Sequence, residues 1–115
     1  MNCAQAREAA RAVLAEHDVA PVLVDDVLTV VSELVSNALR HGEGLTGLRV
    51  TVSAGQVIVE VSDRSTLQPH LRPPSPHTPG GFGWRVVKTL APTAFVRFHR
   101  DGKTIVAPLP LRPAR

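Results

Sequence analysis

The feature that most constrains the fold is a change of hydrophobic period near residue 42. Over residues 22–41 apolar side chains recur with the spacing of an amphipathic helix, and Gly42 and Gly44 then supply helix stop signals. From Leu48 onward apolar and polar residues alternate, as in strands that bury one face. A helix followed at once by alternating strands predicts helices packed on a sheet.

The other segments complete this pattern. Residues 4–17 are rich in alanine, which favours a helix, and turn signals stand at 54–55 and 101–102. The expected elements, in chain order, are a helix over 4–17, a helix over 22–41, a hairpin of 48–53 with 57–62, a helix over 83–90 and a hairpin of 94–99 with 104–109. This order predicts an α+β fold, a two-layer sandwich of a mainly antiparallel sheet with helices on one face.

Residues 64–83 are unlike the rest of the chain. They contain five prolines and three glycines, which exclude a long helix or strand. Loops of this length inside a small domain are commonly functional. We expect a mobile lid that orders over a bound phosphorylated ligand, against the alternative of a proline-stiffened loop that ignores it.

The composition fits one globular domain over residues 1–115. Of the 115 residues 43% are hydrophobic and 20% charged, and the single cysteine, Cys3, excludes an internal disulfide or a cysteine-based zinc site. The start of the chain is not a secretory signal, and its apolar runs are too short for a membrane span. We therefore expect a cytoplasmic protein with no membrane contact.

The charge is uneven along the chain. Residues 1–60 carry 8 acidic and 4 basic residues (net −4), whereas residues 61–115 carry 2 acidic and 9 basic residues (net +7). The basic residues are scattered and do not interleave with the few aromatic ones, as a nucleic-acid platform requires. A small anionic ligand is the expected partner rather than nucleic acid, and a basic nucleic-acid binder is an alternative resting on charge alone.

The long helix carries a polar flank beside its apolar face. Glu33 and Asn37 are four residues apart, so their side chains project to the same place. A carboxylate there can polarise a hydroxyl, and an amide oxygen can bind Mg²⁺. The alternative is an exposed polar rim in which Glu33 bonds to Asn37.

Asp63 ends the second predicted strand. By strand parity it shares a face with Val57, Val59 and Val61, which must meet the helices. A carboxylate aimed inward needs a donor from a ligand or from the protein. Alternatively, Asp63 caps the turn after it.

A glycine-rich stretch leads into the third helix. Residues 79–83 read PGGFG and precede Trp84, so free backbone N–H groups could meet a phosphate there. The motif is neither a Walker loop nor a dinucleotide fingerprint.

Taken together, these motifs resemble a known family. In order, residues 33–38 read ELVSNA, 59–63 VEVSD, 80–87 GGFGWRVV and 102–104 GKT. This combination resembles the GHKL ATP-binding fold shared by gyrase, a heat-shock chaperone family and histidine kinases. Residues 30–42 are most similar to the small bacterial serine kinases that act as anti-sigma factors.

The resemblance implies roles for four side chains. Glu33 matches a general base, and Asn37 a ligand of Mg²⁺. Asp63 matches the residue that accepts a hydrogen bond from the adenine amino group. Thr104 matches a threonine that completes adenine recognition with a buried water.

The resemblance also implies a phosphate site. Gly81 and Gly83 match glycines whose backbone meets the ATP phosphates, with Trp84 as the next backbone donor. Arg40 or His41 would assist with the phosphate charge.

The implied function is that of an Mg-ATP-binding, anti-sigma-like regulator that phosphorylates serine or threonine of an antagonist protein. Its partners would be a sigma factor, an anti-anti-sigma antagonist, or both, and the resemblance leaves a homodimer open. The chain departs from the family pattern in three places: Asp63-Arg64-Ser65 lacks the glycines that usually follow the aspartate, Phe82 stands where relatives commonly have an arginine, and the first strand is missing. Phe82 and Arg64-Ser65 favour the alternative of a non-catalytic nucleotide-binding module that sequesters a partner.

Overall fold

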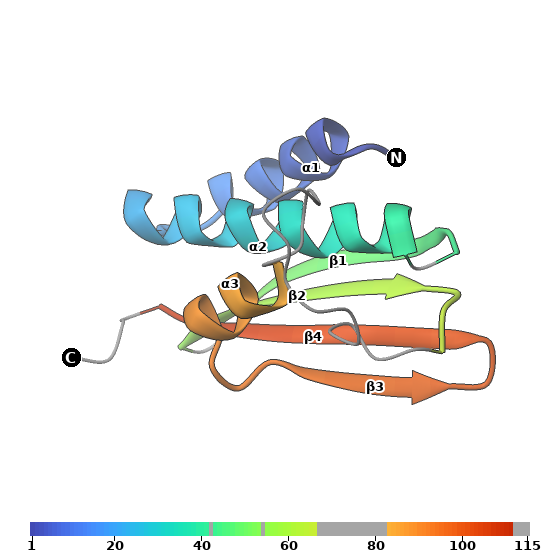
Figure 1. Cartoon of the computed structure of the whole chain (residues 1–115). Coiled ribbons are helices and arrows are strands. Elements are labelled where there is room, and N and C mark those ends of the chain that lie inside the picture. The colour runs from blue at the N-terminus through green and yellow to red at the C-terminus, as the bar shows by residue number, and fades with distance from the viewer. Residues whose placement is uncertain (42, 54, 67–82, 112–115) are drawn as a thin grey trace.

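The segments with helical and with alternating hydrophobic periods form two layers, a layer of helices and a sheet, and the helices lie on one face of the sheet (Figure 1). The computed structural model describes residues 1–41, 43–53, 55–66 and 83–111. The elements of these ranges are α1 (Cys3–Ala15), α2 (Pro21–His41), β1 (Leu45–Ser53), β2 (Gln56–Asp63), α3 (Gly83–Leu90), β3 (Phe95–His99) and β4 (Gly102–Pro110). None of the helices in these ranges is long and apolar enough to cross a membrane.

The sheet has the strand order β1-β2-β4-β3, and all neighbouring strands are antiparallel. The two hairpins predicted from the sequence are therefore joined by β2 pairing with β4. The predicted α+β fold is confirmed. Most of the predicted lid, residues 67–82, lies outside the described residues.

The helix starts have clear local causes. Asn2 caps α1 through a reciprocal pair of bonds with Gln5, a capping box that satisfies two N–H groups at the helix start. Pro21 opens α2, where a missing N–H costs nothing. The first helix ends at Ala15, two residues before the predicted end.

The strands are longer than the alternation predicted. β1 begins at Leu45 rather than Leu48, because a register shift between Leu45 and Gly47 lets pairing continue past an irregular position. β4 runs through Pro108 and Pro110, two residues that interrupt most strands. They are tolerated because β3 stops at Phe95, opposite Val106, and leaves β4 unpaired on that side.

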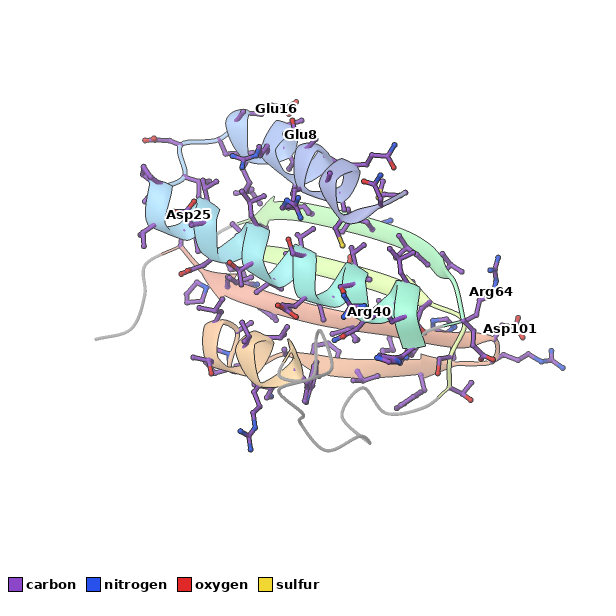
Figure 2. The ribbon with its side chains drawn as sticks, turned by 45° about the horizontal axis from the view of Figure 1, so that its top comes forward. Glu8, Glu16, Asp25, Arg40, Arg64 and Asp101 are labelled. Atoms are coloured by element: carbon purple, nitrogen blue, oxygen red, sulfur yellow. The ribbon has the colours of Figure 1, made fainter. Side chains whose placement is uncertain are left out.

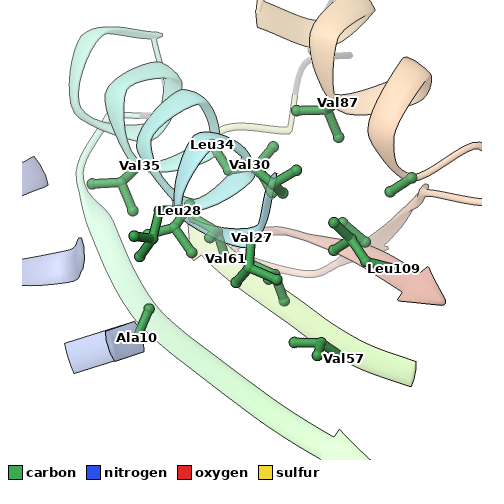
Figure 3. Close-up of a cluster of buried hydrophobic side chains, with 14 of the residues drawn as sticks. Ala10, Val27, Leu28, Val30, Leu34, Val35, Val57, Val61, Val87 and Leu109 are labelled. Atoms are coloured by element: carbon green, nitrogen blue, oxygen red, sulfur yellow. The ribbon is translucent and has the colours of Figure 1, made fainter. Parts of the chain in front are cut away.

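The core lies between α2 and the sheet. Figure 3 shows Val27, Val30 and Leu34 of α2 above the inner face, with Val61 of β2 and Leu109 of β4 among the residues packed there. Ala10 of α1 and Val87 of α3 close the sides of this cluster (Figure 3). The helix is thus apolar on one side and free to present polar groups on its flank.

Leu34→Ala tests this core. Leu34 is 1% exposed, so its truncation should lower the free energy of unfolding by about 2–5 kcal/mol. Leu39→Ala, on the same helix at 47% exposure, should change it by less than about 0.5 kcal/mol. Urea unfolding followed by circular dichroism measures both, and equal effects would contradict the assigned packing.

Candidate functional site

The polar flank of α2 meets the start of α3. Gly83 is buried, and a Cβ atom built on it would lie 2.6 Å from Glu33 Oε2 and 3.2 Å from Asn37 Nδ2. The two side chains that the helical spacing predicted to converge therefore do converge, and they do so at Gly83. Both are half-buried, so the flank is more than an exposed polar rim.

Glycine at residue 83 allows the close approach of the Glu33 carboxylate, because an added Cβ would force that carboxylate to shift. Any larger residue would displace the Glu33 carboxylate, the flexible end of its side chain. The position also brings a carboxylate to the N-terminus of α3, where the helix dipole favours negative charge. Glu33, Asn37 and the first turn of α3 thus form one polar cluster.

The remaining phosphate-site predictions fall in different places. Arg40 and His41 are exposed in the last turn of α2, where positive charge complements the helix dipole (Arg40 is labelled in Figure 2). Trp84 is half-buried and packs against the core. Gly81 lies outside the described residues.

Asp63 is buried at the end of β2, on the face predicted from strand parity. Its side chain is 4% exposed. Oδ1 accepts a hydrogen bond of 2.8 Å from the backbone N–H of Ser65 and one of 3.0 Å from Lys103 Nζ. The donors that a buried carboxylate requires are thus supplied by the protein, and Asp63 also caps its turn as the alternative predicted.

Lys103 is a site residue that the sequence analysis missed. β4 places it directly opposite Asp63, and its own side chain is only 6% exposed. Strand parity could have found it, since Lys103 shares the inner face with Ile105 and Ala107 once β4 is paired with β2. The sequence did not indicate that pairing.

Thr104 points to the opposite face of the sheet. It pairs with Ser62, and the two hydroxyl oxygens are 2.8 Å apart, while His99 Nε2 lies 3.2 Å from Thr104 Oγ1. Ser62 and Thr104, together with Arg97, line a polar hollow of about 240 Å³. The structure therefore does not bring Thr104 together with Asp63.

The two halves of the site lie along α2. Asp63 is beside the connection after this helix, because the N–H of Arg64 donates to the carbonyl of Gly44 at 3.2 Å. Arg64 and Asp101 lie at this same end of the sheet in Figure 2. Asn37 and Glu33 lie one to two helical turns further back. The arrangement therefore places the buried carboxylate of Asp63 near the C-terminal end of α2 and the polar cluster at Gly83 further back along the helix.

Comparison with protein families gives a match over residues 2–107 to the histidine kinase-like ATPase domain. The chain belongs to this family. A search of curated proteins gave no match. Membership of the histidine kinase-like ATPase family supports ATP binding, and it agrees with the fold and with the motifs that resembled GHKL proteins.

The residues of this histidine kinase-like ATPase domain fit a magnesium ion. Among the described residues no group of three or more His, Cys, Asp and Glu could hold a metal. Mg²⁺ commonly binds one or two protein oxygens together with substrate phosphates, so a large cluster is not required. The Asn37 amide and the Glu33 carboxylate, gathered around the missing Cβ of Gly83, supply that kind of oxygen.

Gly102→Ala should destabilise the site end of this domain. A Cβ on Gly102 would overlap the carbonyl oxygen of Asp63, which is backbone and cannot move aside cheaply. We expect a loss of about 1–3 kcal/mol in the free energy of unfolding. Gly47→Ala is the matched control, because its Cβ would meet only the Ser62 side chain at 3.9 Å. A Gly102→Ala protein as stable as the Gly47→Ala protein in thermal unfolding would contradict this contact.

Proposed function

We propose that this domain binds Mg-ATP and transfers the γ-phosphoryl group to a serine or threonine hydroxyl of an antagonist protein, as an anti-sigma-type regulator. One observation carries the proposal: the carboxylate of Glu33 and the amide of Asn37 meet at the N-terminus of α3, beside a glycine. That arrangement joins a proton acceptor, an oxygen ligand and backbone donors in one place. The similarity to anti-sigma kinases over residues 30–42 supports the choice of reaction.

Phosphoryl transfer depends mainly on positioning and charge stabilisation. In the proposed step Glu33 accepts the proton of the serine or threonine hydroxyl, and the hydroxyl oxygen forms a bond to the γ-phosphorus. The bond from that phosphorus to the bridging oxygen breaks, and ADP leaves with the electron pair. Asn37 would hold Mg²⁺, which supplies neutralisation of the phosphate charge when bound.

The other predicted residues extend the proposed site. The N–H groups of Gly83 and Trp84 face the phosphates, with Gly81 before them, and Arg40 and His41 add positive charge from α2. Asp63 accepts from the adenine amino group. Thr104 lies behind the sheet, so in this proposal it contributes by bonding to Ser62 across β2 and β4.

Labelled ATP tests the proposed function. The purified protein is incubated with γ-labelled ATP, Mg²⁺ and candidate antagonist proteins, and label on serine or threonine is the expected result. The partner that carries label is the antagonist, and a sigma factor is identified separately by co-purification. ATP binding without transfer to any candidate would favour the sequestering module instead.

Glu33→Gln separates chemistry from binding. The amide keeps the shape of the side chain and removes the proton acceptor, so transfer should fall by about 10²–10⁴-fold while ATP affinity changes little. Glu16→Gln, an exposed residue at the end of α1, should transfer like the wild type. If Glu33→Gln also transfers like the wild type, Glu33 is not the base.

Asn37→Ala tests the metal ligand. Calorimetry with ATP in Mg²⁺ and in excess EDTA should show that the wild type loses affinity when the metal is removed. The Asn37→Ala protein should bind equally weakly in the two conditions, because its metal-dependent share of the affinity is gone. An unchanged Mg²⁺ dependence would remove Asn37 from the site.

A further inference from the structure

The buried ion pair between Asp63 and Lys103 is more than the sheet needs. On the inner face of β4 the next residues of the same row are Ile105, Ala107 and Leu109, all buried and apolar. An apolar residue at 103 would suit this row, whereas burying an ammonium group costs several kcal/mol before any pairing. The fold alone therefore does not account for a charge at residue 103.

The pair has hydrogen-bonding capacity to spare. The bonds from Ser65 N–H and Lys103 Nζ both go to Oδ1 of Asp63, and no described residue donates to Oδ2. No fully buried side-chain polar atom of the described residues lacks a partner, so Oδ2 keeps access to solvent.

The ammonium group of Lys103 is equally underused. It has three N–H donors, and one bond, to Asp63, is made within the described part of the chain. A free acceptor and free donors therefore stand side by side at the inner end of the sheet.

This combination selects the kind of group that fits. Asp63 and Lys103 have opposite charges 3.0 Å apart, so the pair as a whole is neutral. A phosphate placed there would meet the carboxylate and be repelled. A neutral ligand with a hydrogen-bond donor next to an acceptor would bond to both Asp63 and Lys103. The Watson–Crick edge of adenine is such a group, because its 6-amino donor lies beside the N1 acceptor.

We infer that Lys103 is a base-reading residue, which donates a hydrogen bond to N1 of adenine while Oδ2 of Asp63 accepts one from the 6-amino group. This inference rests on the proposed ATP binding and adds a specificity-determining residue to it. The pairing of β2 with β4 fixes the backbones of the two residues directly opposite each other, so they form a rigid reader. Lys103 does this through direct contact with the base.

Nucleotide analogues test the inference on the wild-type protein. Isothermal calorimetry compares ATP with 1-deaza-ATP, which lacks the N1 acceptor and keeps the amino group, and with 3-deaza-ATP as the matched control. We expect 1-deaza-ATP to bind about tenfold or more weakly than ATP, as for a lost hydrogen bond to a charged group, and 3-deaza-ATP to bind like ATP. GTP should bind more weakly than ATP.

The variant Lys103→Met links the discrimination to the residue. Methionine has nearly the length of the lysine side chain and lacks the ammonium donor. ATP and 1-deaza-ATP should therefore bind this variant with equal affinity. Lys88→Met, on the exposed end of α3, should keep the wild-type preference. Since removing one partner of a buried pair destabilises a fold, a thermal melt accompanies the variant, and if it is unfolded the wild-type comparison decides alone.

The outcomes distinguish the inference from the proposed function. A wild type that binds no ATP overturns both. A wild type that binds ATP and 1-deaza-ATP equally, or prefers GTP, overturns the inference. A folded Lys103→Met protein that keeps the preference overturns it too. One that binds ATP more tightly than the wild type also overturns it, since Lys103 then blocks the carboxylate.

Discussion

The packing of α2 against the sheet is the constraint on which the rest of the structure depends. Its apolar face covers β2 and β4, and α1 and α3 pack against its sides. Each buried valine or leucine contributes about 1.5–3 kcal/mol, so the helix is held in one rotation about its axis. That rotation leaves Glu33 and Asn37 on the flank toward α3. The same burial that stabilises the fold therefore aims the polar cluster.

The Asp63–Lys103 pair contributes in the opposite way. A carboxylate and an ammonium are removed from water at the end of the sheet, and their attraction offsets a desolvation penalty of several kcal/mol per ion. Such a pair stabilises the fold little compared with apolar residues of similar size. The pair lies near the C-terminal end of α2, whereas the polar cluster of Glu33 and Asn37 lies one to two turns back along that helix. A nucleotide lying along α2 would place its base at one end and its phosphates at the other.

The proposed catalytic function and its sequestering alternative would share this site and differ in the step after nucleotide binding. Both would use Asp63, whereas only the proposed phosphoryl transfer would need the carboxylate of Glu33 as a proton acceptor. Arg64 and Ser65 directly follow Asp63 in the chain. Ser65 is buried and donates its backbone N–H to Asp63, a bond that any residue other than proline could make at this position.

The sequence by itself determined the elements, the α+β class and the convergence of Glu33 with Asn37. Each of these follows from spacing within one helix or strand: a period of 3.6 or 2 decides which residues share a face, and Asp63 was placed on the inner face by that rule alone. This spacing rule does not predict which residues of different helices and strands contact each other. Lys103 faces Asp63, and Thr104 turns away from it, because β2 pairs with β4 in one register, and a shift of one residue would exchange their faces. Gly83 likewise reaches Glu33 only because α3 packs on α2. Local spacing determines the side of a helix or strand from which each side chain projects. Contacts between segments distant in sequence form only when their apolar faces are buried together.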